Sequence, residues 1–278
     1  MFLLASTNFG IYKKRGKMRF ISFGSGSSGN CYYLCEEDFG IIIDAGIGIR
    51  SIKKGFRDYG LALNSVKAII VTHDHTDHVR AVGALSTEFN IPVYATRLVH
   101  KSIDTNYHIH KKIDSSRQKT FEAGDSLQLG PFCIKAFTVP HDSASNSGYF
   151  IETAKSNFCL MTDMGSITEE MKGYISKAEN LVIESNYDEA MLECGPYPAR
   201  LKARIRSGNG HSSNVETAKA LRENLTSKTK RIWLCHLSAE NNHPELARKT
   251  MESVLFDLES IPQLIVLKRR IPSEVFEL

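Results

Sequence analysis

The sequence lacks any long apolar run. No stretch approaches the roughly 18 to 20 consecutive apolar residues that a membrane-spanning helix needs. The opening MFLLAS is too short for a signal peptide, and the basic residues follow this apolar stretch instead of preceding it. We therefore expect no contact with a membrane and a cytoplasmic location.

Cysteine is sparse and irregularly spaced. The 278 residues include six cysteines, with neither CxxC pairs nor the density of a disulfide-stabilised scaffold. Because most of them lie in apolar, strand-like runs, we interpret them as small buried side chains in a reducing compartment. A cysteine-based zinc knuckle is thereby excluded.

The sequence also has little excess charge. The formal net charge is +4, with 42% hydrophobic and 24% charged residues, which is typical of an ordinary globular protein. Such a charge is compatible with a polyanionic substrate but far from the charge density of a dedicated nucleic-acid binder. Composition alone names no function.

The first fifty residues predict a series of strands. A strand over 18–23 is interrupted by the glycine- and serine-rich turn 24–30, and a second strand resumes at 31–34. Residues 40–46 form a β-branched run that ends in glycine. Residues 1–17 have little pattern, so we expect an N-terminal extension that could be disordered and need not belong to the natural protein.

Strands and helices alternate along the rest of the chain. A helix is predicted over 47–58, and the nearly continuous apolar run 66–72 is typical of a strand buried on both faces. Ser213 resembles the cap of a helix that extends to about Leu225. With strands in both halves and no linker or repeat, we expect one α/β domain over 18–278.

Three histidines and two aspartates follow the run 66–72 within six residues, at His73, Asp74, His75, Asp77 and His78. Polar side chains packed so densely at the end of a buried strand are costly unless something pairs with them. Imidazole and carboxylate groups are ligands for zinc or manganese. The alternative is a solvated histidine-rich loop. We favour that solvated alternative for three other histidines, which lie in a lysine-rich polar stretch: His100, His108 and His110.

Three later residues stand at the ends of further apolar, strand-like segments. His141 follows Phe137–Pro140, Asp163 follows Cys159–Thr162 and His236 follows Ile232–Cys235. Each of them alone would more often be structural than functional.

An HxHxDH motif after a strand, followed in order by these three residues, resembles the metallo-β-lactamase superfamily. The resemblance implies a four-layered αββα sandwich with the site at one rim of both sheets. It also implies a first metal ion held by His73, His75 and His141. A second ion would be held by Asp77, His78 and His236, with Asp163 bridging the two.

Two further motifs resemble the phosphodiesterase branch of that superfamily, which includes transfer-RNA processing endonucleases. They are Glu184-Ser185-Asn186 and the segment 210–214, Gly-His-Ser-Ser-Asn. The resemblance makes His211 a candidate general acid, oriented by Glu184. Alternatively, His211 caps a loop and Glu184 ends a strand in solvent. We expect Asp44 and Thr72 to orient metal ligands.

The segments 23–30 and 236–245 resemble the bacterial YycJ (WalJ)-like proteins, and the similarity covers the chain from residue 18 onward. It implies a compact, nuclease-like protein related to DNA exonucleases. Ser212 departs from the leucine expected after the histidine in this branch. Between Asp163 and His236 there is no room for the extra domain of β-CASP enzymes, and no glycine-rich protruding arm is evident.

Substrate contacts are therefore expected from loops at the rim. The backbone NH groups of the turn 24–30 are candidates for binding a phosphate, as is the basic run 200–206. The alternatives are a tight strand turn and a solvated helix face. The side chains we assign to the substrate are Ser27, Ser28, Asn30 and Asn214.

The resemblance implies a hydrolase with two divalent metal ions, zinc or manganese, with iron as a further alternative. A metal-bridging hydroxide would attack phosphorus in line, oriented by Asp77, while His211 assists departure of the alcohol. The expected substrate is a nucleic acid or another phosphodiester. One rival is hydrolysis of a small thioester, lactone or cyclic phosphodiester. Another is a metal-binding regulatory module that acts through a protein partner. The sequence leaves open which metal is bound, whether DNA or RNA is cut, from which end of the strand cleavage proceeds, and the oligomeric state.

Overall fold

The computed structural model of the protein describes residues 16–278, whose strands form two seven-stranded mixed sheets. In the first sheet, β3 to β6 are parallel and the strands on the β1 side are antiparallel. Its order is β14 (Phe276–Glu277), β1 (Met18–Gly24), β2 (Cys31–Glu36), β3 (Phe39–Ile43), β4 (Val66–Ile70), β5 (Val93–Ala95) and β6 (Gln118–Thr120).

The second sheet repeats this division, with β7 to β10 antiparallel and β10 to β13 parallel. Its order is β13 (Gln263–Val266), β12 (Arg231–Cys235), β11 (Asn180–Glu184), β10 (Asn157–Met161), β9 (Ser147–Glu152), β8 (Phe132–Thr138) and β7 (Ser126–Leu129).

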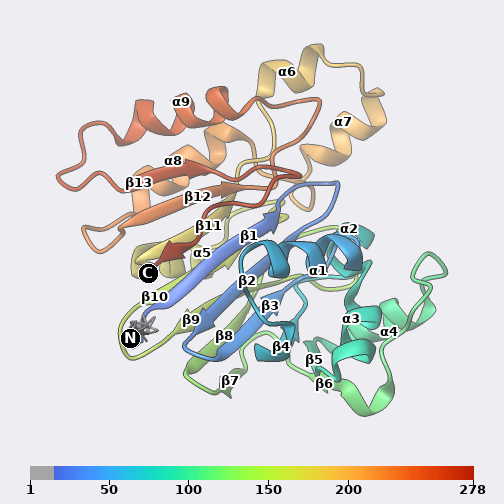
Figure 1. Cartoon of the computed structure of the whole chain (residues 1–278). Coiled ribbons are helices and arrows are strands. Elements are labelled where there is room, and N and C mark those ends of the chain that lie inside the picture. The colour runs from blue at the N-terminus through green and yellow to red at the C-terminus, as the bar shows by residue number, and fades with distance from the viewer. Residues whose placement is uncertain (1–15) are drawn as a thin grey trace, which may run out of the picture.

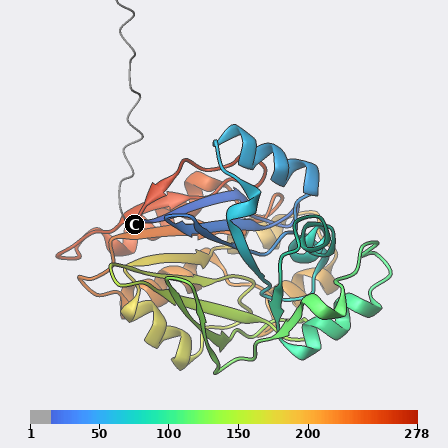
Figure 2. The same cartoon turned by 60° about the horizontal axis from the view of Figure 1, so that its bottom comes forward.

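Helices cover the outer face of each sheet (Figures 1 and 2). Those on or beside the first sheet are α1 (Ile49–Asp58), α2 (Thr76–Val79), α3 (Val82–Phe89) and α4 (Arg97–Thr105). Those on the side of the second are α5 (Glu169–Lys177), α6 (Glu189–Cys194), α7 (Ala199–Ile205), α8 (Asn214–Asn224) and α9 (Pro244–Leu255).

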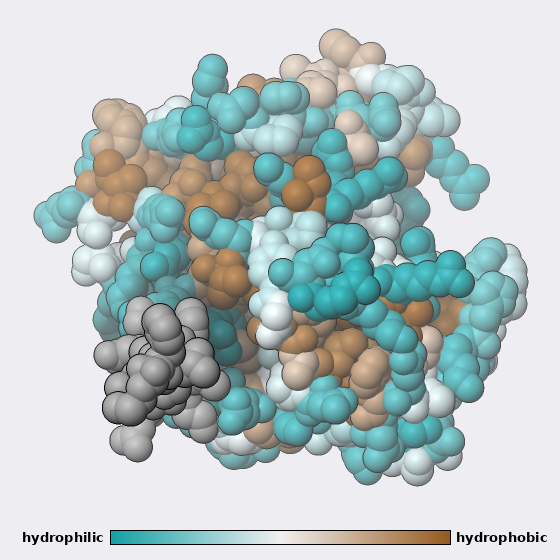
Figure 3. Space-filling model, viewed as in Figure 1, coloured by the Kyte–Doolittle hydropathy of each residue, from teal (hydrophilic) through white to brown (hydrophobic). Residues whose placement is uncertain are grey.

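Three apolar cores hold these four layers together. One joins α1, α3 and α4 to the first sheet, a second lies between the sheets around Trp233, and a third joins the second sheet to α5, α8 and α9. Figure 3 shows hydrophilic residues over the outer side of α1, where Lys53, Lys54 and Arg57 are exposed. The predicted α/β sandwich of four layers is confirmed.

Local sequence explains where several elements begin. Ser213 accepts a hydrogen bond from the backbone N–H of Glu216, whose side chain accepts one from Ser213 in return, so α8 begins with a complete capping box. The predicted helix over 47–58 is α1, which begins two residues later. Within residues 16–278 no helix has the length and apolarity needed to cross a bilayer.

The prediction that His100 is solvated is wrong. His100 is buried on the inner face of α4, where its Nε2 lies 3.0 Å from the carbonyl oxygen of Lys119. His108 and His110 are exposed. The predicted extension 1–17 falls almost wholly outside the described residues, and β1 begins at Met18.

Candidate metal centre and active site

The candidate site lies where strands of both sheets end. Loops after β3, β4, β8, β10, β11 and β12 meet there, so residues far apart in sequence come together. This placement follows from the parallel halves of the sheets, whose carboxyl ends point to the same rim. The short helix α2 starts in the middle of the histidine cluster and turns His78 inward, where it is fully buried.

The structure brings together both sets of residues that the sequence assigned to metal ions. Ligand atoms of His73, His75 and His141 all lie within 4.8 Å of one another, as do those of Asp77, His78 and His236. Asp163 lies between the two groups. Its Oδ2 is 3.3 Å from His78 Nε2, and its Oδ1 is 3.8 Å from His141 Nε2.

These residues fit divalent cations. Nε2 of His73 is buried and has no hydrogen-bond partner among residues 16–278. His141 Nε2 lies only 3.3 Å from His75 Nδ1. Imidazole nitrogens that converge in this way, next to a buried carboxylate, are satisfied together by a cation, since each offers a lone pair to the same point. Nitrogen and carboxylate oxygen are ligands suited to zinc and manganese.

Buried groups behind the cluster orient its imidazoles. Asp44 Oδ2 lies 2.7 Å from His78 Nδ1, so Nε2 of that ring faces the cluster. Thr72 donates to Asp44 from its backbone N–H and its hydroxyl, and Thr72 Oγ1 is 3.0 Å from His73 Nδ1. On the other side, His141 Nδ1 lies 2.9 Å from the carbonyl oxygen of Gly210. The orienting positions expected for Asp44 and Thr72 agree with these contacts.

Three residues of the site have left-handed backbones. Asp44, Asp163 and His236, which follow β3, β10 and β12, have φ values of 58°, 56° and 52°. Residues other than glycine rarely adopt this region, and it is tolerated where the surroundings over-determine it. At each of these three residues, the left-handed backbone directs a polar side chain into the cluster just after an apolar strand ends.

A partly buried histidine, His211, and a fully buried carboxylate, Glu184, form a hydrogen-bonded pair beside the cluster. Their Nδ1 and Oε1 atoms are 2.8 Å apart, and Glu184 also accepts a hydrogen bond from the backbone N–H of Met164 at 2.7 Å. Burial lowers the pKa of His211, but the Glu184 carboxylate outweighs it, so this pKa lies above its usual value. Glu184 is fully buried, which contradicts the alternative that it ends a strand in solvent.

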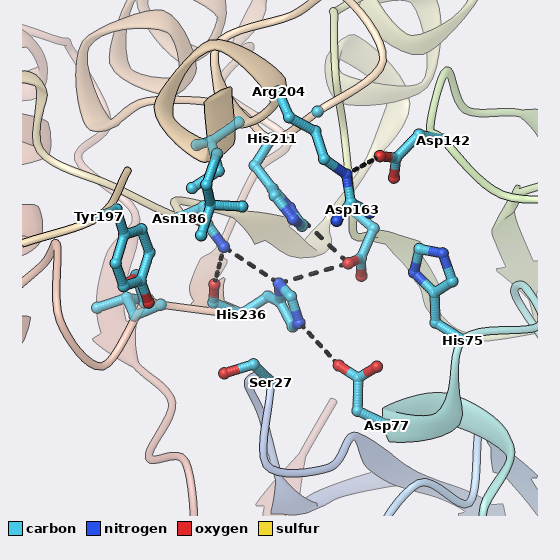
Figure 4. Close-up of a pocket in the computed structure, with 15 residues that line it drawn as sticks. Ser27, His75, Asp77, Asp142, Asp163, Asn186, Tyr197, Arg204, His211 and His236 are labelled. Carbon is cyan, nitrogen blue, oxygen red and sulfur yellow. Dashed lines mark hydrogen bonds and ion pairs between the residues drawn. The ribbon is translucent and has the colours of Figure 1, made fainter. Parts of the chain in front are cut away.

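The cluster opens into a pocket of about 240 Å³ (Figure 4). His211, Asp163, His236 and Asp77 line it. The α6–α7 segment also lines it, with Tyr197, Leu201, Arg204 and Ile205. This segment adjoins His211, whose backbone N–H donates to the Ile205 carbonyl oxygen at 2.9 Å, and Arg204 Nε donates to the carboxylate of Asp142. One arginine of the basic run 200–206 therefore reaches the pocket. Tyr197 carried no signal in the sequence, because only the fold brings it to the site, whereas Asn186 belongs to the motif Glu184-Ser185-Asn186 but was given no role of its own.

The four expected substrate contacts separate into two groups. Ser27 lines the pocket and Ser28 is half-buried nearby, in the turn between β1 and β2. Asn30 is fully buried, where its Oδ1 accepts from Gly26 N–H and its Nδ2 is 2.8 Å from His78 Nε2. Asn214 is also fully buried, with its amide bonded to Ser185 and Asn242. Both asparagines are buried and bonded to other residues of the protein, so neither position agrees with a substrate contact.

Comparison with known proteins gives consistent matches. The beta-lactamase superfamily domain matches residues 40–237. The exodeoxyribonuclease YycJ of Bacillus anthracis is 35% identical over 238 residues, which cover 86% of this chain and 89% of the relative. The exodeoxyribonuclease WalJ of Streptococcus pneumoniae serotype 2 is 36% identical over 231 residues, covering 83% and 86%. Zinc-bound PqqB from Methylobacterium extorquens shares the fold, with a TM-score of 0.73 at 15% identity over 94% of this chain and 100% of that one.

Proposed function

Because the chain belongs to the YycJ/WalJ family of the beta-lactamase superfamily, we propose that it is an exodeoxyribonuclease that uses two divalent metal ions. Two observations support a phosphodiester substrate. The relatives that match most of this chain are named as exodeoxyribonucleases. His211, which is bonded to Glu184, lines the same pocket as His75 of one ligand group and Asp77 and His236 of the other. We also propose a cytoplasmic location, since the six cysteines are free, as is typical of proteins in a reducing compartment.

His73, His75 and His141 would hold one ion, and Asp77, His78 and His236 the other, with Asp163 shared between them. Such ions, when bound, make a water molecule nucleophilic at neutral pH and neutralise charge on the phosphate. The donor set of imidazoles and carboxylates accepts zinc or manganese, with iron as a further alternative, so we leave the metal open among these three.

The side chains around the cluster would act on the substrate as follows. Asp77, whose side chain is 21% exposed, faces the pocket and accepts a hydrogen bond from the attacking water. The water gives up one proton to solvent, and the new O–P bond forms as the P–O bond to the leaving nucleotide breaks. His211 Nε2 then gives its proton to the departing alcohol oxygen, while Glu184 holds Nδ1 and keeps the ring protonated.

Product release from end-labelled DNA and RNA, each single- and double-stranded, tests this proposal. We expect manganese- or zinc-dependent shortening of DNA from an end, lost in Asp77→Ala and reduced in His211→Ala. Asp58→Ala is the matched control, since Asp58 is an exposed carboxylate on α1. Protein that retains two metal ions and cleaves no polymer would overturn the proposal. Hydrolysis of a thioester or lactone by that protein would favour the small-substrate alternative.

A further inference from the structure

A basic turn follows β13 directly, at Lys268, Arg269 and Arg270. Lys268 and Arg270 are exposed and Arg269 is half-buried. No carboxylate of residues 16–278 forms an ion pair with any of these three cations, whereas Arg204 and Arg206 near the pocket are both paired. The turn therefore presents positive charge that the described part of the protein leaves uncompensated.

Two loops of the active site hold this turn in place. Arg269 Nη1 donates to the carbonyl oxygen of Ser238 at 2.9 Å, and Ser238 lines the active-site pocket. The Arg269 side chain also packs on the turn between β1 and β2, because a Cβ added at Gly26 would lie only 2.9 Å from its Cγ. In Figure 1 the segment after β13, in red, runs beside this blue turn. Arg269 thus fixes the basic turn to both loops.

A second cavity, of about 300 Å³, is lined by the basic turn. Its wall combines the three cations with apolar residues, of which Leu237 and Leu267 are buried and Pro244 and Ile271 are exposed. Leu237 also lines the active-site pocket, so the two cavities are neighbours. Apolar side chains next to cations match a nucleotide, whose sugar and base are largely apolar on their faces and whose phosphate is anionic.

We propose that this second cavity binds the DNA strand next to the scissile bond, with Lys268 and Arg270 on its backbone phosphates. The inference rests on the proposed nuclease function. Contacts of this kind are independent of base sequence and strengthen binding through release of counterions. Arg269, whose guanidinium is bonded to Ser238, positions the turn.

The double variant K268A/R270A tests this assignment. Its matched control is K177A/K228A, which removes two lysines near the amino ends of β11 and β12, whereas Glu184 and His236 stand at the carboxyl ends of those strands. The probe is a fluorescein-labelled single strand of about 12 deoxynucleotides, bound with chelator present to prevent cleavage and titrated at several salt concentrations.

We expect Kd to rise about tenfold in K268A/R270A, and the slope of log Kd against log salt to fall by about 1.4, since each phosphate contact on a single strand contributes about 0.7. The control should keep the wild-type Kd and slope, and K268R/R270K should keep the wild-type Kd within about twofold. Hydrolysis of bis(p-nitrophenyl) phosphate by the metal-loaded enzyme should not change, because that compound has no neighbouring nucleotide.

The outcomes separate this assignment from the proposed function. If wild type binds and shortens DNA while K268A/R270A has an unchanged Kd and slope, the basic turn is not a DNA site and the nuclease proposal stands. Loss of bis(p-nitrophenyl) phosphate hydrolysis in K268A/R270A would also overturn the assignment, since it would mean that the turn acts on the pocket itself. If wild type neither binds nor shortens DNA, both proposals fail.

Discussion

Asp44 Oδ2 lies 2.7 Å from His78 Nδ1, and both side chains are fully buried. The carboxylate fixes which nitrogen of His78 faces the metal cluster, and it also accepts two hydrogen bonds from Thr72. One buried aspartate thus connects the end of β3 to the histidine cluster that follows β4. Asp44 does this from a left-handed backbone, with φ of 58°.

We expect Asp44→Asn to weaken metal binding by about 10- to 100-fold, the usual effect of removing a carboxylate that supports a metal-bound imidazole. Asparagine tolerates a left-handed backbone, so the substitution changes the hydrogen bonding and charge while the chain reversal is retained. Metal content after dialysis against graded chelator measures the effect. Asp58→Asn on the exposed face of α1 is the control, and equal metal affinity in the two variants would contradict the role of Asp44.

A glycine is needed at position 46 because the backbone of Asp77 and His78 packs directly against it. A Cβ at this position would lie 1.5 Å from the carbonyl oxygen of Asp77 and 2.7 Å from the backbone nitrogen of His78. We expect Gly46→Ala to displace α2 and destabilise the protein by about 1 to 3 kcal/mol, the usual cost of overpacking. It should also lower the bound metal.

Gly48→Ala provides the comparison for that variant. It lies two residues away, has φ of −62°, and has nothing within 4 Å of an added Cβ. Denaturant unfolding and metal analysis of the two variants should therefore differ sharply. Similar stability and metal content in Gly46→Ala and Gly48→Ala would show that the close approach at Gly46 is unimportant.

Most of the candidate site could be predicted because its residues stand at strand ends and match the motif of a known superfamily. Apolar runs mark where strands stop, and the resemblance to that superfamily grouped His141, Asp163 and His236 before the fold was known. The structure gives the physical reason: β10 and β12 run parallel, and β8 runs in the same direction as β10 because two antiparallel pairings separate them, so all three strands end at one rim.

The remaining errors concern which way a side chain faces. Asn30, at the end of the turn before β2, and Asn214, the first residue of α8, are both fully buried, and His100 is buried on α4. A polar residue in a turn gives no local sign of whether its partners are solvent or buried groups. The basic turn at Lys268–Arg270 was missed for a related reason, since only the packing of Arg269 on Gly26 and Ser238 brings it to the site.

Removal of metal should lower thermal stability, because a ligand that binds only the folded state stabilises it by RT ln(1 + [L]/Kd). At about 100-fold excess over Kd this is about 2.7 kcal/mol, and we expect a fall of about 5 °C in Tm when chelator is added to the metal-loaded protein. Differential scanning calorimetry measures it. In Asp163→Asn the chelator should lower Tm by less than in wild type, since Asp163 stands between both ligand groups. An equal fall in Tm in wild type and Asp163→Asn would argue against a bridging position for Asp163.

The role of His211 can be separated from metal binding by changing the leaving group. Departure of a deoxyribose alcohol needs a proton, whereas p-nitrophenolate leaves without one. If His211 supplies that proton, His211→Ala should reduce kcat on DNA by about 10² to 10⁴ and on bis(p-nitrophenyl) phosphate by much less. Bound metal should not change, because His211 is in neither of the two predicted triads. Loss of metal in His211→Ala would instead assign His211 to a further group of converging donors, with Asp163, Glu184 and His236.

Glu184→Gln should give the same pattern to a smaller extent, since Glu184 acts through His211, to which it is bonded at 2.8 Å. Steady-state rates on both substrates, with metal content measured in the same preparations, make the comparison. Equal losses on the two substrates would mean that His211 binds or orients the phosphate and does not protonate the leaving group. Glu184→Gln should also lower bound metal, because the same carboxylate lies 3.0 Å from Nδ1 of the ligand His236, so its rates are compared at full metal occupancy.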